Sequence, residues 1–254
     1  MFNNMKFTGK MLAAVLLVLV LSTPTVLALT AEEIIEKRDE NEYYVSARME
    51  AEMIIKGSNN KRVKEMVSIT DGEDSYTYFT NPRDRGTKYL KKDDKLYMFF
   101  ADAEEIVPIS GHLLEKSMEG SDFSYKDMME SEKLTELYDF ELLEENAEYN
   151  GRPCYVIEGI KKEGKEDVQY YRRKAWVDKE RFIGLKGEYY AQSGRLLKES
   201  RVTKVEKVQG RWYPMEFIME NKLKQDTSTQ LIINSIKFDP EIPAGTFTLR
   251  NLQS

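Results

Sequence analysis

Residues 43–53 read YYVSARMEAEM, and apolar side chains occupy every second position from Tyr43 to Met53. A period of two is typical of a long, half-buried β-strand. The turn-forming run Gly57-Ser58-Asn59-Asn60 follows, and residues 61–70 have the pattern of an antiparallel return strand before Asp71-Gly72. The sequence therefore predicts that this part of the chain forms a β-hairpin.

Further strand patterns follow at similar spacing. They cover residues 75–80, 87–90, 95–100, 154–159, 168–178, 185–192, 195–208, 211–220 and 230–238. Ser193-Gly194 and Gln209-Gly210 are hairpin signals between consecutive strands. We expect a mostly β fold with a few helices (α+β), in which roughly ten strands joined by short turns form one meandering antiparallel sheet.

Helical patterns occur in two places. Thr30 and Glu33 form a capping box at the start of a short amphipathic helix that should end before Tyr43. Between residues 109 and 143 the apolar residues recur at helical intervals, and Ser124 with Asp127 has the spacing of a helix cap. We expect one or two helices here, inserted between strands of a single sheet.

The first 28 residues have the features of a secretory signal peptide. Lys6 and Lys10 precede an unbroken apolar run over residues 11–21, and small residues lead to Ala28. This run is much shorter than the roughly 20 residues that span a bilayer, so we predict cleavage after Ala28 rather than an uncleaved anchor. Residues 29–254 then form one extracytoplasmic domain, periplasmic or secreted.

Charge and composition exclude several classes of function. The whole chain has 38 basic and 44 acidic residues, a net charge of −6. Residues 1–28 contain two lysines and no acid, so residues 29–254 carry 36 basic and 44 acidic side chains, a net charge of −8. This balance argues against nucleic acid as a partner and against passive binding to anionic lipid surfaces.

The chain has one histidine, His112, and one cysteine, Cys154. A single cysteine excludes internal disulfides and Cys-rich metal sites, so we predict no metal, no cofactor and a buried, unreactive thiol. Sequence motifs for a nucleophile elbow and for a phosphate-binding loop are missing. We predict that the protein is not an enzyme, although its many carboxylates leave a carboxylate-dependent hydrolase as an alternative.

Flexible apolar side chains gather on the predicted strands, where they suit variable acyl chains. The alternative interpretation is an ordinary core beneath a covering helix. As candidate lipid-binding residues we identify Met49, Met53, Met98, Phe100, Met215, Phe217 and Met219.

Two motifs carry a resemblance to a known family. Residues 79–87 read FTNPRDRGT and residues 118–127 read MEGSDFSYKD, with weaker matches at residues 151–158, 176–178, 194–198 and 242–247. The chain resembles the bacterial outer-membrane lipoprotein-sorting proteins of the LolA-like superfamily, in particular a branch with a GSDFSY-type motif. The resemblance covers essentially all of residues 29–254.

This resemblance implies an incompletely closed antiparallel β-barrel whose concave face is covered by helices and holds the acyl chains of a lipoprotein or lipid. It implies a carrier for lipoprotein sorting across the envelope, served by a membrane-embedded delivery or receptor protein. A non-catalytic envelope sensor or interaction module on the same fold is the alternative. Within the motifs we expect structural roles for Pro82, Gly86, Gly120, Ser121, Asp122 and Phe123, because they suit turns, backbone capping and the anchoring of a helix.

Overall fold

Thirteen antiparallel strands form one sheet in a computed structural model that describes residues 28–165 and 168–253. The strands of the first half are β1 (Ser46–Lys56), β2 (Lys61–Asp71), β3 (Asp74–Phe79), β4 (Lys88–Lys92), β5 (Lys95–Phe100) and β6 (Glu105–Ile109). Those of the second half are β7 (Tyr138–Tyr149), β8 (Arg152–Lys161), β9 (Arg172–Asp178), β10 (Gly184–Tyr190), β11 (Leu196–Val208), β12 (Arg211–Asn221) and β13 (Ser228–Phe238).

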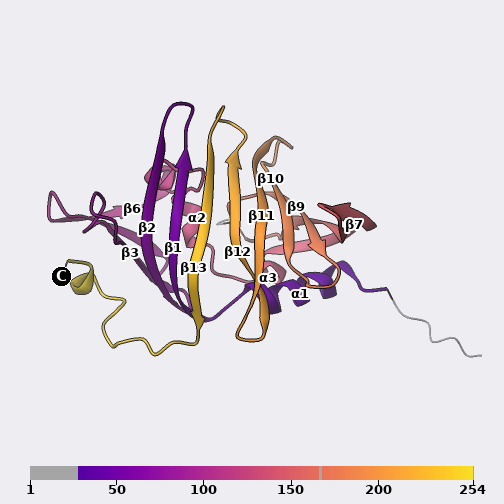
Figure 1. Cartoon of the computed structure of the whole chain (residues 1–254), viewed down its shortest axis with the longest axis horizontal. Helices are drawn as coiled ribbons and strands as arrows, with labels where there is room; N and C mark the ends of the chain where they lie inside the picture. Colours follow the sequence, from indigo (N-terminus) through magenta and orange to yellow (C-terminus); the bar gives the residue numbers. More distant parts are fainter. Residues whose placement is uncertain (1–27, 166–167, 254) are drawn as a thin grey trace, which may run out of the picture.

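Each half is a meander of neighbouring hairpins, and β1 pairs with β13 to join the two halves. The strand order is β6-β5-β4-β3-β2-β1-β13-β12-β11-β10-β9-β8-β7, so β6 and β7 are the two edges of the sheet. They lie on opposite sides in Figure 1. The sheet is therefore not closed, and the estimate of ten strands was too low.

The two strands absent from the sequence prediction are these edge strands, β6 and β7. β6 contains Pro108, and β7 carries the acidic residues Glu141, Glu144, Glu145 and Glu148. Proline and charge are common on exposed edges because they block pairing with another chain, and they also weaken the strand signal. The helical pattern predicted up to residue 143 was wrong beyond residue 137, where β7 begins.

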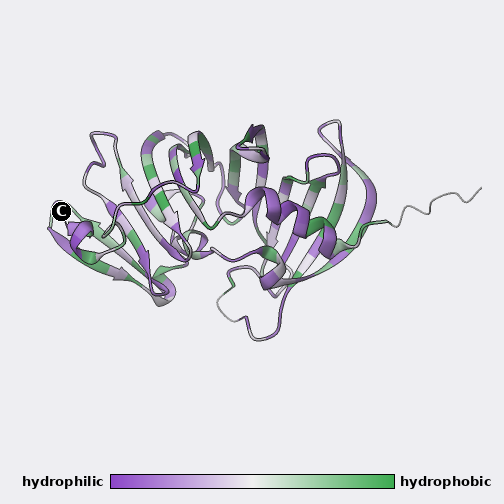
Figure 2. Cartoon of the chain, turned by 90° about the horizontal axis from the view of Figure 1, so that it is seen from below, coloured by the Kyte–Doolittle hydropathy of each residue, from purple (hydrophilic) through white to green (hydrophobic). Residues whose placement is uncertain are grey.

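The chain between the two edges, residues 110–137, is named here the insert. It contains two 3-10 turns, Gly111–Leu113 and Met118–Gly120, and two short helices, α2 (Tyr125–Met129) and α3 (Leu134–Leu137). In Figure 1 the central strands lie in front and α2 lies behind them. Seen from below, the sheet curves, and helices lie along its inner side (Figure 2).

Helix α1 (Ala31–Glu42) begins at the predicted capping box, in which the amide of Glu33 donates to Thr30 Oγ1 at 3.2 Å. Ile34 and Ile35 are fully buried and pack with Ile157 and Val177. The helix thus covers the inner side of the second half of the sheet. The predicted leader covers residues 1–28, of which residues 1–27 lie outside the described residues.

Helix α4 (Leu249–Gln253) covers the other face of the first half. Leu252 is fully buried against Tyr76, Leu90 and Phe99, whereas Met98 on the alternate face packs beneath the insert. Strand β5 is apolar on both sides because both of its faces are covered.

Candidate functional site

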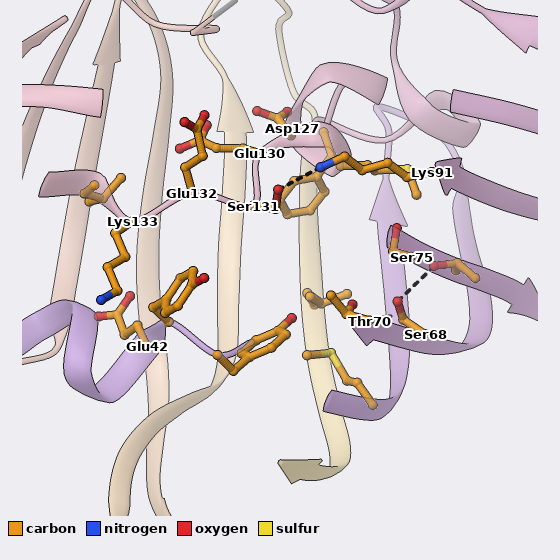
Figure 3. Close-up of a pocket in the computed structure, with 18 of the residues that line it drawn as sticks. Glu42, Ser68, Thr70, Ser75, Lys91, Asp127, Glu130, Ser131, Glu132 and Lys133 are labelled. Atoms are coloured by element: carbon orange, nitrogen blue, oxygen red, sulfur yellow. Dashed lines mark hydrogen bonds between the residues drawn. The ribbon is translucent and has the colours of Figure 1, made fainter. Parts of the chain in front are cut away.

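A cavity of about 500 Å³ lies between the inner face of the sheet and the insert. Strands β1, β2, β3, β4, β9, β10, β12 and β13 contribute to its wall, together with α1, α2, α3 and the chain between α2 and α3. Figure 3 shows the labelled polar side chains around it, including Glu42 from α1 and Asp127 from α2. The site is thus built by elements far apart in the sequence.

Methionine dominates the apolar wall of the cavity. Met53 is fully buried, and Met118 and Met219 are almost fully buried. The apolar lining comprises Met49, Met53, Met66, Met118, Phe123, Met128, Leu134, Met219 and Leu231. Because methionine is flexible and polarizable, this wall can adapt to apolar ligands of variable shape.

The seven candidate lipid-binding residues are divided between the cavity and other sites. Met49, Met53 and Met219 line it. Met98 packs with Phe79 and Tyr89 beneath the insert, and Met215 packs in a core cluster around Tyr213.

Two of the seven candidates are aromatic, and neither is part of the cavity lining. Phe100 lies at the end of β5 with 41% of its surface exposed. Phe217 contacts Phe123 edge to face, with ring centroids 6.0 Å apart. Strand alternation showed which residues share a face within one strand, but the insert determines which part of the inner face of the sheet stays open.

Three lining methionines escaped the sequence prediction of the site. Met66 comes from β2, while Met118 and Met128 come from the insert. The alternation in β2 and the helical spacing in the insert were both visible in the sequence. No local signal showed that these residues would face Met53 across one cavity.

The predicted motif at residues 118–127 anchors the insert to the hairpin of β12 and β13. The buried carboxylate of Asp122 accepts hydrogen bonds from Thr229 Oγ1 at 2.7 Å and Thr227 Oγ1 at 2.8 Å. It also accepts from the amide of Asn221 at 3.2 Å. The amide of Phe123 donates to Ser121 Oγ at 3.2 Å.

Gly120, in the same motif, has a φ of +73°, a left-handed conformation that favours glycine. Its carbonyl accepts a hydrogen bond from the guanidinium of Arg62. This turn lets the chain reverse direction before Ser121 and Asp122.

The other motif, at residues 79–87, holds the insert from the side of the first half. Pro82 lies in the turn between β3 and β4, where Asn81 Nδ2 donates to Asp84 at 2.6 Å. Lys64 is buried and pairs with Asp84 at 2.6 Å and with Glu119 of the insert at 2.8 Å. Gly86 has a φ of +96° in the same turn.

Helix α2 and its C-cap residue place two carboxylates beside the cavity, and both have partners. Asp127 accepts hydrogen bonds from Tyr170 Oη at 2.6 Å and from Lys198 Nζ at 2.6 Å. Glu130 pairs with the half-buried guanidinium of Arg173. Burial and the neighbouring Asp127 carboxylate raise the pKa of Tyr170, so this phenol stays protonated as a donor.

Helix α1 supplies a further polar group of side chains. Arg38 pairs with Glu42, and Asp39 accepts hydrogen bonds from the amide and hydroxyl of Thr135 at 3.2 Å each. Burial raises the pKa of both Asp39 and Glu42, and the nearby Arg38 opposes this change. The cavity therefore has polar groups on the side of α1 and also at β2, β3 and β4, which contribute Ser68, Thr70, Ser75, Thr77 and Lys91. Its apolar wall comes mainly from β1, β12, β13 and the insert.

Lys91 in β4 is the buried cation of the cavity, with 4% of its surface exposed. Its ammonium donates to the carbonyl of Met129 and to Ser131 Oγ, both at 2.7 Å. Figure 3 shows it reaching toward Ser131 across the end of the cavity. Burial lowers the pKa of Lys91, against the attraction of more distant carboxylates led by Glu73.

Within residues 28–165 and 168–253, no group of three or more His, Cys, Asp and Glu side chains is placed to hold a metal ion. His112 is exposed in a 3-10 turn, and Cys154 is fully buried in a core cluster. Burial raises the pKa of the Cys154 thiol to about 11, as expected for an unreactive group. In the same part of the chain, no helix has the length and apolar character needed to cross a bilayer.

The sequence model of one protein family, whose description reads "Uncharacterized protein", matches residues 71–254. The chain belongs to this family. No curated protein sequence matches the chain.

Three solved structures share the architecture over nearly their whole length. A LolA superfamily protein from Nitrosomonas europaea is 25% identical with a TM-score of 0.73, covering 88% of this chain and 100% of its own. A DUF1329 family protein from Desulfovibrio piger is 24% identical with a TM-score of 0.77, covering 87% and 97%. A domain from Vibrio parahaemolyticus named for outer membrane lipoprotein sorting is 22% identical with a TM-score of 0.75, covering 88% and 98%. The resemblance to the LolA-like superfamily is confirmed, and the chain has the LolA-like fold.

Proposed function

We propose that the protein is a non-catalytic carrier that binds the acyl chains of a lipid or lipoprotein in the methionine-lined cavity. The observation that supports this function is the cavity of about 500 Å³ between the insert and the sheet, with Met53 and Met219 on its apolar wall. Transfer of acyl chains from water into such a site contributes about 0.8 kcal/mol for each buried methylene. A carrier needs no other chemistry.

The carrier acts outside the cytoplasm, as one acyl-binding domain over residues 29–254 after removal of a signal peptide. The net charge of −8 for these residues disfavours passive adsorption to anionic membranes. Delivery to a membrane therefore requires a membrane-embedded partner. The Vibrio parahaemolyticus domain is named for outer membrane lipoprotein sorting, and this name supports sorting as the process served.

Gentle purification from the native envelope, followed by native mass spectrometry and lipid extraction, tests the function directly. We expect a bound lipid or lipopeptide that a fluorescent acyl probe displaces. Met53→Phe and Met219→Phe should weaken probe binding at least about tenfold, because each adds bulk to the cavity wall. Phe100→Leu, at an exposed position outside the lining, is the matched control. If neither an endogenous lipid nor the probe binds the folded wild type, the carrier function is wrong.

A further inference from the structure

Three lysines are buried among the described residues, and they differ in their partners. Lys64 pairs with Asp84 at 2.6 Å, and Lys198 pairs with Asp127 at 2.6 Å. Lys91 donates only to neutral oxygens, those of Met129 and Ser131. Buried charges are normally paired, because removal of an ion from water costs several kcal/mol. Lys91 therefore stands out as a buried ammonium with no carboxylate partner within ion-pair distance in this part of the chain.

Lys91 is placed where its charge can contact a ligand in the cavity. Its side chain lines the cavity (Figure 3). An ammonium has three donors, and the two neutral oxygens take two of them. One donor remains for a group that enters the cavity, and the carboxylates that attract the charge of Lys91 act from beyond ion-pair distance.

The carboxylates of the lining leave room for an anion. Asp127 and Glu130 are neutralised by Lys198 and Arg173. Glu73 and Glu132 are exposed to solvent, which screens their charge. Asp39 and Glu42 also line the cavity, beside Arg38, and Asp74 is paired with Lys92. None of the described carboxylates is within ion-pair distance of Lys91, so an entering negative headgroup can pair with it, whereas a positive headgroup would be repelled.

Cavity volume is sufficient for a long acyl chain. A methylene group occupies about the volume of one water molecule, ~30 Å³, so a cavity of about 500 Å³ has room for a chain the length of palmitate. The single Lys91 ammonium in the lining offers a binding site for one headgroup.

Building on the proposed function, we propose that the cavity takes a single-chain anionic amphiphile, whose acyl chain lies on the methionine wall and whose carboxylate or other anionic headgroup pairs with Lys91. The anionic headgroup of the ligand would be the counter-ion of the Lys91 ammonium. A charge-assisted hydrogen bond of this kind distinguishes an anion from a neutral headgroup by about tenfold or more.

Palmitate and hexadecanol test this assignment, because they have the same chain length and differ in headgroup charge. We expect the wild type to bind one palmitate per protein in native mass spectrometry, at least about tenfold more tightly than hexadecanol in a probe-displacement titration. Equal affinities would overturn the role of Lys91. Two or more palmitates displaced together by one acyl probe would overturn the single-chain assignment.

Lys91→Met should abolish the preference for palmitate and leave hexadecanol binding within about twofold, because methionine keeps the apolar stem without the charge. Lys92→Met is the matched control: Lys92 is the next residue, pairs with Asp74 and is 38% exposed at its side chain. This control should keep the wild-type preference. A Lys91→Met protein that retains the preference contradicts the proposal. If Lys91→Met does not fold, the affinities of the wild type for palmitate and hexadecanol alone test the proposal.

The two proposals fail in different ways. If palmitate and hexadecanol bind equally, and Met53→Phe weakens both, the acyl carrier function stands and the anionic ligand is wrong. If neither compound binds the folded wild type, the carrier function itself is wrong.

Discussion

Asp122 and Thr229, which are 107 residues apart, are joined twice: Thr229 Oγ1 donates to the Asp122 carboxylate at 2.7 Å and accepts from the Asp122 amide at 2.9 Å. Both residues are almost fully buried. Asp122 belongs to the insert and Thr229 to β13, so this pair fixes the insert over the inner face of the sheet. The shape of the cavity depends on that attachment.

Replacement of Asp122 by alanine should therefore destabilise the insert more than a simple surface change would. The substitution leaves Thr227, Thr229 and the Asn221 amide without their acceptor, which costs about 3 kcal/mol in the free energy of unfolding. Urea unfolding measures this loss, and limited proteolysis should cut the insert faster. Asp139→Ala, whose side chain is 75% exposed, should change stability by less than about 0.5 kcal/mol. Equal losses for the two variants would contradict the anchoring role.

Acid should remove a second source of stability at Asp178. Burial of this carboxylate opposes ionisation, but hydrogen bonds from Arg152 and from the amides of Arg181 and Glu180 outweigh it and lower its pKa. Because the pKa of Asp178 is lower in the folded state than in the unfolded state, its ionised carboxylate stabilises the fold at pH values above the unfolded-state pKa of about 3.9. This contribution to the free energy of unfolding is lost as the pH falls through the folded-state pKa. Asp178→Asn should cost about 3 kcal/mol at pH 7.

The pH profile of that variant gives the decisive comparison. Urea unfolding from pH 7 down to pH 2 should show the free energies of the wild type and Asp178→Asn converging below about pH 4. The free energy of unfolding of Asp139→Asn should change with pH in the same way as that of the wild type. A constant gap between wild type and Asp178→Asn at all pH values would show that ionisation of Asp178 does not supply the stability.

A methyl group at Gly86 should be more harmful than one at Gly72. Both glycines have a positive φ, +96° and +58°. A β-carbon at Gly86 would lie 2.6 Å from Cβ of Ala101, whereas none of the described atoms would lie within 4 Å of one at Gly72. We expect Gly72→Ala to cost about 1 kcal/mol and Gly86→Ala about 2–4 kcal/mol in thermal unfolding. Similar losses would show that the contact with Ala101 can relax freely.

The acidic residues of β7 should keep this edge of the sheet unpaired. Glu144→Val with Glu145→Val would extend the apolar surface around Leu143, which is 45% exposed. We expect concentration-dependent association in size-exclusion chromatography with light scattering. The control removes two acids from interior strands, Glu206→Val in β11 and Glu216→Val in β12. Association of the control to the same extent would point to lost net charge rather than to an open edge.

Features that depend on neighbouring residues could be predicted from the sequence. The capping boxes of Thr30 with Glu33 and of Ser124 with Asp127 are both present, and the Ser193-Gly194 and Gln209-Gly210 turns lie between paired strands. Alternation placed Met49 and Met53 on one face of β1 and Met219 on one face of β12, but it did not fix which face of either strand is inward. These signals are local, because caps, turns and strand period act over a few residues.

Features that depend on distant segments could not be predicted in this way. Met98 follows the same alternation as the lining residues, but the insert covers it. Lys91 lies in the charged run Lys91-Lys92-Asp93-Asp94-Lys95, which has the composition of a solvated turn. Its burial results from contact with Met129 and Ser131, 38 and 40 residues further along the chain.

The pairing of β1 with β13 has a consequence for the time course of folding. Every other strand pair joins neighbours in the chain, whereas this one joins Ala47 to Phe238. During synthesis, the strands of each meander can pair early. The pairing of β1 with β13, called here the seam, can form only after nearly all of the polypeptide has been made. Such non-local pairing slows folding to the range of milliseconds to seconds. Stopped-flow refolding should be slowed by Ile233→Ala in the seam and hardly changed by Val177→Ala in β9, and the opposite order would show that the seam does not limit the rate.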